Sequence, residues 1–323
     1  MSADVVRLGV IGAGRMGRVH LDTLALTDAA TPVAVVDPVP AAREAVAARG
    51  LATYATVDDL LEHGGFDAML IAAPTDLHRE LVVRLATAGV PVLCEKPCGV
   101  RASDARAAAD AALAAGTVLQ IGYWRRFVPE LVALRERVAS GALGEPSLVV
   151  CHQWDQDPPS AQFRAHSGGI AADMAVHEID EVRWLLGAEF ADVTAVPAGP
   201  SAPEATAADP DSAVVLGRLS DGTAVSITLG RHFPPGDSCW VELFARGGYE
   251  RALFMWGDDA ERAFHAALAA QADAFAAAVR GEPQRGATGE DAVAALEVAE
   301  RIGASLAAAG RPGAADATEV SDA

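Results

Sequence analysis

The sequence is poor in aromatic residues and in positive charge. Aromatic side chains make up 5% of the 323 residues, so alanine and aliphatic side chains must fill most of the core. Lysine and arginine number 25 against 44 aspartate and glutamate residues, and the formal net charge is -19 at pH 7. Nucleic acids and anionic membranes bind basic surfaces, so neither is expected as a partner. A few local donors can still hold one phosphate group.

Long apolar runs and cysteines are also scarce. No uncharged apolar stretch reaches the roughly 18 residues that a membrane span needs. The N-terminus has no basic region followed by a cleavable apolar run, so we expect a cytoplasmic protein. The four cysteines (Cys94, Cys98, Cys151 and Cys239) show neither a secreted disulfide framework nor paired zinc spacings. We expect reduced, mostly buried thiols and no metal site.

The first 120 residues alternate between strand-like and helix-like patterns. Hydrophobic residues make up 51% of the chain, enough for a sizeable core, and the length suits two domains. Apolar or β-branched runs predict strands within 5–14, 32–37, 67–74, 90–97 and 117–123, and helical spacing predicts helices over 15–26, 40–50, 76–89 and 102–116. Strands that alternate with helices predict a parallel, doubly wound α/β sheet, the Rossmann type.

A glycine-rich segment joins the first expected strand to the first expected helix. It reads Gly12-Ala13-Gly14-Arg15-Met16-Gly17, and Asp37 ends the second expected strand. In this context GxGxxG is the dinucleotide fingerprint: Gly12 makes the tight turn, Gly14 admits the pyrophosphate, and Gly17 lets the helix pack closely. The amide groups at the start of the helix meet the anion. A glycine-rich turn without a ligand is the alternative.

Asp37 favours NAD over NADP. Its carboxylate can accept hydrogen bonds from the adenosine ribose and would repel a 2′-phosphate. Pro38 follows, where an arginine could have offset that repulsion.

The stretch DMAVHEIDEVRWLLG (173–187) is predicted to be an amphipathic helix. Asp173 and His177 stand four residues apart and therefore on neighbouring positions of one helix face. A carboxylate beside an imidazole can fix its tautomer and favour its protonated form. The pair is either structural, with Asp173 as a helix N-cap and His177 as a core histidine, or half of a proton-transfer site.

Several motifs together resemble one family. GVIGAGRMGRVH, VVDP, IAAPTDLHRE, PVLCEKP, IGYWRRF and SGGIAADMAVHEIDEVRWLLG follow one another in the order found in the glucose–fructose oxidoreductase/inositol dehydrogenase/MocA-type (Gfo/Idh/MocA) oxidoreductases. Within that family the sequence looks most like the inositol 2-dehydrogenases. The resemblance covers most of the chain, and EKP combined with D-x-x-x-H is much rarer than GxGxxG alone.

The resemblance implies two domains. Residues 1–122 would form the NAD-binding Rossmann domain, and 123–323 a substrate-binding and oligomerisation domain on a large open, mostly antiparallel sheet. Strand patterns over 145–154, 191–198, 211–219, 223–231 and 239–246 fit this, as do helical patterns over 260–280 and 289–310. The small, acidic residues from about 311 to 323 are expected to be disordered. The sheet is expected to join subunits into a homodimer or homotetramer.

The resemblance also implies site residues. Lys96, Asp173 and His177 match the catalytic positions. His177 would take the proton from a secondary alcohol, Asp173 would orient it, and Lys96 would stabilise the alkoxide and could share the proton transfer. Lys96 paired only with Glu95 is the alternative. The matching cofactor contacts, beyond the fingerprint residues, are Ala73, Pro74, Thr75, His78, Glu95 and Lys96. His78 could equally cap the loop after the fourth strand.

The expected substrate is a small polyol. The pocket candidates are Trp124, Arg125, His152, Trp154, Asp155 and His232, a set of donors and aromatic faces that suits a cyclitol or pyranose. Trp124 stands where inositol dehydrogenases often have methionine, and Arg125 could instead be surface charge. Two other functions stay open on this fold: another dehydrogenase or reductase, for a sugar, dihydrodiol or imine, and a non-catalytic dinucleotide-binding sensor.

Overall fold

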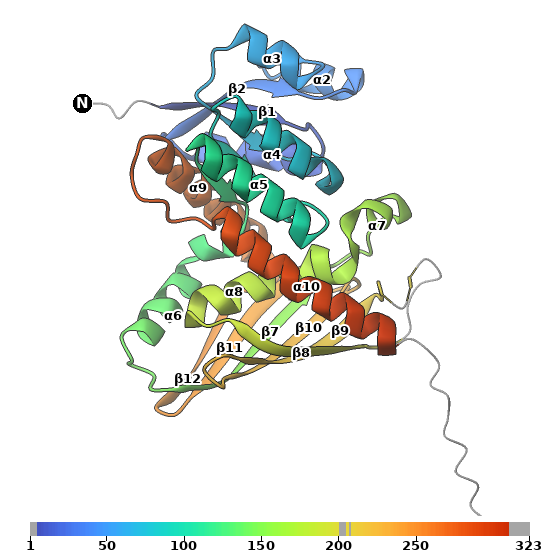
Figure 1. Cartoon of the computed structure of the whole chain (residues 1–323), viewed down its shortest axis with the longest axis vertical. Helices are drawn as coiled ribbons and strands as arrows, with labels where there is room; N and C mark the ends of the chain where they lie inside the picture. The colour runs from blue at the N-terminus through green and yellow to red at the C-terminus, as the bar shows by residue number, and fades with distance from the viewer. Residues whose placement is uncertain (1–4, 200–204, 207, 310–323) are drawn as a thin grey trace, which may run out of the picture.

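The chain forms two six-stranded sheets with helices between and around them. The computed structural model describes residues 5–199, 205–206 and 208–309 (Figure 1). The tail from about 311 to 323, predicted to be disordered, lies outside the described residues. The α/β class with one parallel and one mostly antiparallel sheet is confirmed.

The first sheet, sheet A, is parallel throughout. Its strands lie in the order β3 (Ala52–Tyr54), β2 (Ala30–Val36), β1 (Val6–Ile11), β4 (Ala68–Ile71), β5 (Val92–Cys94) and β6 (Leu119–Ile121). The connections contain α1 (Arg15–Thr23), η1 (Leu24–Leu26), α2 (Pro40–Ala47), α3 (Val57–His63), η2 (Thr75–Leu77), α4 (His78–Thr87) and α5 (Ala102–Ala115). Strand β4 is fully buried because helices cover both faces, and its sequence AMLI is accordingly apolar throughout. The carboxyl ends of β1, β2, β4 and β5 meet at one edge.

The second sheet, sheet B, has strand order β12 (Gly248–Met255), β11 (Ser238–Ala245), β7 (Pro146–Trp154), β10 (Ala224–Gly230), β9 (Ser212–Leu219) and β8 (Phe190–Pro197). Only β7 and β10 pair in parallel. The other elements of this half are η3 (Trp124–Phe127), α6 (Pro129–Ala139), α7 (Ala161–Ser167), the π-helical turn η4 (Ala171–Ala175), α8 (Val176–Leu186), η5 (Gly257–Asp259), α9 (Ala260–Val279) and α10 (Gly289–Ala309).

Helices cover one face of sheet B, and none of the described helices covers the other. In Figure 1, α6, α8 and α10 lie on the side of sheet B that is turned toward sheet A. We call the opposite side the outer face. Residues with large exposed apolar side chains gather there: Val196, Leu216, Phe244, Tyr249 and Leu253.

The two C-terminal helices pack across the boundary between the sheets. Ala272, Phe275 and Ala276 of α9 are buried in the same apolar cluster as Val10 of β1 and Leu70 of β4. Helix α10 packs on α5 as well as on α8 and β8. The two sheets fall on either side of residue 122, whereas the packing of α9 and α10 holds both halves together.

Candidate active site

The glycine turn after β1 leaves room for a ligand at one position only. Gly12 has φ +100°, and a Cβ there would lie 2.5 Å from the Ala72 carbonyl oxygen. A Cβ on Gly17 would lie 1.9 Å from the Gly12 carbonyl oxygen. A Cβ on Gly14 would meet no atom within 4 Å. Gly12 and Gly17 therefore shape the turn, and Gly14 faces open space at the start of α1.

Asp37 is held at the end of β2 by backbone amides. Its Oδ2 accepts a hydrogen bond from Ala13 N and its Oδ1 one from Val39 N, both at 2.8 Å. Each carboxylate oxygen keeps a further lone pair for a ribose hydroxyl. Arg43 Nη1 donates to the Asp37 carbonyl oxygen at 2.6 Å. The sequence reasoning considered only Pro38 and missed this guanidinium, because it comes from the following helix.

The remaining expected cofactor residues lie along the same edge of sheet A. Arg15 and Met16 begin α1, Ala73 and Pro74 follow β4, and Thr75 opens η2. His78 is buried: Nδ1 lies 2.7 Å from the Pro97 carbonyl oxygen and Nε2 2.8 Å from that of Ala73. Burial lowers the pKa of His78. Its ring thus ties the loop after β4 to the loop after β5, which is the capping alternative.

The carboxylate of Glu95 binds His20 of α1 and not the ammonium group of Lys96. His20 Nε2 of α1 donates to Glu95 Oε1 at 2.6 Å, and Lys96 N donates to Oε2 at 3.1 Å. Burial is the largest influence on Glu95 and raises its pKa, but the hydrogen bond and charge of His20 together with the charge and backbone amide of Lys96 outweigh it, so the pKa of Glu95 lies below its ordinary value. His20, which the sequence analysis did not single out, thus links α1, the helix after the glycine turn, to the loop that carries Lys96.

Lys96 is the only lysine among the 323 residues, and its ammonium contacts the second half of the chain. Nζ donates to the Asp173 carbonyl oxygen at 2.8 Å and lies 3.3 Å from Asp173 Oδ1. The two side chains are 19% and 14% exposed. The contact brings together the end of β5 and the π-helical turn η4. Single-turn π-bulges of this kind occur frequently at functional sites.

Asp173 does not orient His177, which corrects the sequence expectation. Its carboxylate is engaged by Lys96 through Oδ1 and by Arg231 through Oδ2, at 3.4 Å. Within the described part of the chain, His177 takes part in no hydrogen bond or ion pair, and its Nδ1 is buried without a partner. The four-residue spacing had assumed an α-helix, whereas Asp173 lies in the π-helical turn and His177 in α8.

His177 is buried and electrically neutral. Burial, followed by the positive charges of Lys96 and Arg125, holds the pKa of His177 well below its ordinary value. The ring is 6% exposed and meets Trp124 and Tyr123 edge-on, with centroids 6.3 and 6.2 Å away. A neutral imidazole is the form that can accept a proton. Trp124, an expected pocket residue, thus lies beside His177.

Both terminal nitrogens of Arg125 are paired within the protein, so they are not free to bind a substrate. Its guanidinium is buried among Glu178 at 2.5 Å, Glu181 at 3.1 Å and Gln153 at 2.9 Å. A buried cation must be paired, and Arg125 finds its carboxylate partners on α8. Its role is therefore to fix the position of that helix. Burial raises the pKa of Glu181 to about 7, although Arg125 acts in the opposite direction.

His152 and Trp154 lie on the outer face of sheet B, so the structure does not bring them to the site. His152 stacks on Trp240 with ring centroids 4.2 Å apart, and Trp154 lies over Gly230 and meets Phe233. The burial of Val149, Cys151 and Gln153 shows that alternate residues of β7 face the helices. Because strand side chains alternate, 152 and 154 must point outward.

Asp155, one residue beyond β7, does lie near the site. Burial raises the pKa of Asp155 to about 6; a hydrogen bond from Gln153 opposes this and the charge of Asp173 adds to it. His232 is exposed, whereas its neighbour Arg231 is completely buried. The sequence reasoning chose His232 and missed Arg231. The alternation of buried Val225, Ile227 and Leu229 along β10 would have predicted that 231 points inward.

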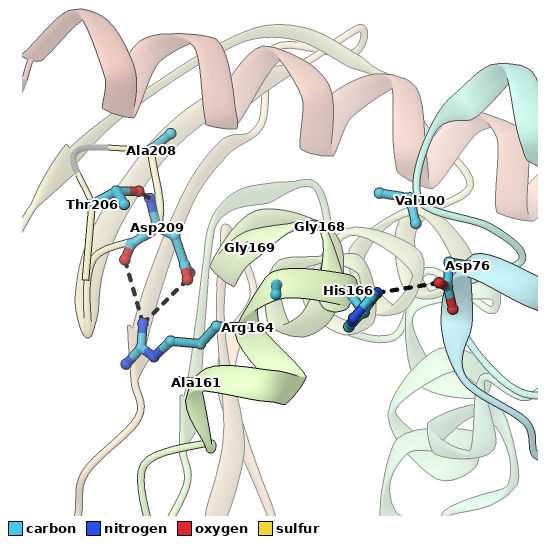
Figure 2. A pocket seen from close by; sticks show the side chains of 11 residues that line it. Asp76, Val100, Ala161, Arg164, His166, Gly168, Gly169, Thr206, Ala208 and Asp209 are labelled. Carbon is cyan, nitrogen blue, oxygen red and sulfur yellow. Dashed lines mark hydrogen bonds and ion pairs between the residues drawn. The ribbon is translucent and has the colours of Figure 1, made fainter. Parts of the chain in front are cut away.

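A cavity of about 510 Å³ adjoins this site between α7 and the loop after β4. Figure 2 shows Arg164 of α7 pointing to Asp209 and His166 of α7 pointing to Asp76 beyond β4. Lys96, Asp173 and His177 do not line this cavity. Asp209 connects the cavity to the site around Asp173, because it lines the cavity and also accepts a hydrogen bond from Arg231 Nη1 at 2.7 Å.

The described part of the chain has neither a metal-binding cluster nor a membrane-spanning helix. In residues 5–199, 205–206 and 208–309, no group of three or more His, Cys, Asp or Glu side chains could hold a metal ion. No helix in the same part of the chain is long and apolar enough to cross a membrane.

Comparisons with known proteins show the family to which the chain is similar. The family model described as "Oxidoreductase family, NAD-binding Rossmann fold" matches residues 6–123, and the GFO/IDH/MocA C-terminal domain matches residues 131–249. The rhizopine catabolism protein MocA of Rhizobium meliloti is 48% identical over 294 residues, 91% of this chain and 93% of that protein. The inositol 2-dehydrogenase of Rhizobium meliloti (strain 1021) is 32% identical over 320 residues, 94% and 97% of the two chains.

Solved structures extend the comparison to the cofactor. The crystal structure of GenD2 from gentamicin A biosynthesis, in complex with NAD, superposes with a TM-score of 0.87 at 27% identity. The match covers 96% of each chain.

Proposed function

Because the chain belongs to the GFO/IDH/MocA family of NAD-binding oxidoreductases, we propose that it oxidises a secondary alcohol of a cyclitol or related sugar. The observation that carries the proposal is the meeting of Lys96 from the Rossmann half with Asp173 from the other half, beside a neutral His177. Support for a cyclitol comes from the name of the inositol 2-dehydrogenase relative.

The residues around the glycine turn fit NAD. Gly14 has no neighbour where a side chain would stand, and Asp37 is anchored with lone pairs to spare. Bound NAD supplies the acceptor for the hydride of the alcohol carbon. The carboxylate of Asp37 disfavours a 2′-phosphate, so NAD is the proposed physiological cofactor.

Three side chains would handle the hydroxyl group. The neutral ring of His177 accepts its proton, since burial keeps that ring in the accepting form. The ammonium of Lys96 donates a hydrogen bond to the same oxygen and stabilises the negative charge that develops there. Asp173 holds Lys96 in place through two contacts rather than orienting His177. Trp124 forms one wall, and Asp155 offers a carboxyl group to a substrate hydroxyl.

The test is a screen for NADH formation with inositols, hexoses, their phosphates and a rhizopine, each with NAD and with NADP. The rhizopine is included because the relative that is 48% identical carries that name. Lys96→Ala, Asp173→Ala and His177→Ala should each lose about a hundredfold or more in turnover while still binding NAD, as expected for proton-transfer and charge-stabilising groups. Near-normal turnover in all three would refute the assignment. A complete lack of NADH formation, with a protein partner that co-purifies, would favour the sensor function.

We further propose that two copies of the chain associate through the outer face of sheet B. The apolar side chains gathered there are about half exposed, with Leu216 at 55% and Val196 at 52%. A patch of this kind on a folded protein marks an interaction site. Leu216→Asp should convert the homodimer or homotetramer to smaller species in light scattering. An unsubstituted protein that is monomeric would refute this association.

A further inference from the structure

Arg231 occupies an unusual position directly behind the proposed proton-transfer site. Its side chain is 0% exposed, and it follows the last residue of β10. Nη2 lies 3.4 Å from Asp173 Oδ2, and Nη1 lies 2.7 Å from Asp209 Oδ1. Its backbone N donates to the Asp211 carbonyl oxygen at 2.8 Å. Both terminal nitrogens of the guanidinium are therefore held by carboxylates, while Nε has no hydrogen-bond partner in the described part of the chain.

This position determines where the carboxylate of Asp173 points. Each oxygen of that carboxylate has one cationic partner, Lys96 on Oδ1 and Arg231 on Oδ2. A rotation of Asp173 toward His177 would break both contacts. Because a guanidinium is planar and its donors form a rigid fork, it fixes the direction of a carboxylate in a way that a single ammonium does not.

Asp209 in turn fixes Arg231. Its Oδ1 accepts from Arg231 and from Ile170 N at 2.8 Å, and its Oδ2 accepts from Arg164 Nη1 at 3.1 Å. The result is a row of alternating charges, Lys96, Asp173, Arg231, Asp209 and Arg164, whose side chains are at most 19% exposed. The row runs from the proposed site to the cavity beside α7, and Figure 2 shows its last two members, Asp209 and Arg164.

We propose that Arg231 is a positioning residue that holds Asp173 against Lys96 and thereby places the ammonium for the reaction. The inference rests on the proposed function. It assigns the Asp173 carboxylate to the Lys96–Arg231 pair and leaves His177 to act alone. A lysine at 231 would keep the charge but lose the fork, so it separates positioning from simple charge balance.

The matched control is Arg126. It is also a nearly buried guanidinium held by two carboxylates, Asp180 at 2.6 Å and Asp291 at 3.1 Å, but Lys96 and Asp173 are not among its partners. Replacing a buried guanidinium by lysine keeps the charge but loses the fork of donors, and this weakens the ion pairs at either position. Arg126→Lys therefore reproduces the loss of stability without the proposed loss of positioning.

The only lysine of the chain provides a direct signal. Biosynthetic incorporation of ¹³C-lysine labels Lys96 alone, so its ε-carbon resonance can be observed in the intact protein at one fixed pH. The charged groups that act on this ammonium are Asp173 and, at longer range, Asp155, Glu178, His177, Glu95 and His78. Loss of the nearby guanidinium leaves the Asp173 carboxylate entirely to Lys96, so the resonance should change position in Arg231→Gln.

The expected outcome combines kinetics and this resonance. Arg231→Lys should lower kcat by about a hundredfold, as small misplacements of reacting groups do, with the KM for NAD unchanged. Arg231→Gln should do the same and shift the Lys96 resonance. Arg126→Lys should leave kcat unchanged, and Arg126→Gln, which adds no second lysine, should leave the resonance unchanged. Folded Arg231 variants with normal kcat and an unshifted resonance would overturn the proposal.

A further variant, Asp209→Asn, tests the proposal even if the Arg231 variants do not fold. Asp209→Asn keeps Arg231 and the side-chain volume but removes the charge that anchors it. It should lower kcat and shift the Lys96 resonance in the direction opposite to Arg231→Gln; no change in either would also overturn the proposal. If the unsubstituted protein oxidises no polyol, the proposed function fails, while the Lys96 resonance still reports whether Arg231 acts on Lys96 through Asp173.

Discussion

The glycine turn permits a sharp test, because the structure predicts opposite outcomes for two neighbouring substitutions. A Cβ on Gly14 has no neighbour within 4 Å, and the residue has φ -68°, which any L-residue adopts. Gly14→Ala should therefore fold normally, and reduced freedom of the unfolded chain could even add about 0.4–1 kcal/mol. A Cβ on Gly17 would lie 1.9 Å from a backbone carbonyl oxygen. That atom cannot move away cheaply, so Gly17→Ala should cost about 1–3 kcal/mol or more.

Binding of NAD tests the open space at Gly14 directly. If the open space at Gly14 is where the pyrophosphate lies, Gly14→Val should weaken NAD binding by about tenfold or more, equivalent to about 1.4 kcal/mol. Thermal unfolding without ligand measures the first effect, and titration of NAD by tryptophan fluorescence or calorimetry measures the second. The reasoning is refuted if Gly14→Val binds NAD as the unsubstituted protein does, or if Gly17→Ala is as stable.

Three further predictions concern charge. Asp37→Ala should let the protein use NADP, because it removes the carboxylate and leaves the Arg43 guanidinium beside residue 37. Asp37→Ala/Arg43→Ala should not use NADP, and NADPH formation distinguishes the two variants. The pKa of Glu181 is raised from its ordinary value of 4.5 to about 7 in the folded protein. The protonated side chain therefore stabilises the fold below pH 4.5, and this stabilisation, about 3 kcal/mol, is lost as the pH rises through 7. Urea unfolding should show a smaller loss between these pH values in Glu181→Gln, and an equal loss would contradict the prediction. The pKa of His177 is lowered by burial, so stability should fall as pH drops below 6.5, and His177→Gln should fall less over the same range.

Local sequence patterns predicted the nucleotide-binding half well. Apolar runs that alternate with helical patterns gave the parallel sheet, and the GxGxxG turn lies where it was predicted. Two short elements, β3 and α3, were not predicted, because segments of three and seven residues carry little periodic signal. In the second half β12 was missed: its charged and exposed residues follow the alternation of an edge strand rather than an apolar run.

The candidate site divides in the same way. Sequence reasoning named Lys96, Asp173 and His177, and the structure brings Lys96 to Asp173 with His177 close by. It assigned His152 and Trp154 to the pocket, although the alternation along β7 turns both to the outer face. That error came from residue type, since aromatic and imidazole rings suit a sugar, while strand geometry decides which side they face.

The sequence by itself determined which groups with useful chemistry stand at the ends of strands, because hydrophobic periodicity and glycine positions are local properties of the chain. Only the tertiary structure decided which of those groups meet. Asp173 could have paired with His177 four residues away. Instead it is shared by Lys96, 77 residues before it, and Arg231, 58 residues after it. A buried carboxylate takes the cations that packing brings to it, and that packing depends on how the two sheets and the π-helical turn are placed in space.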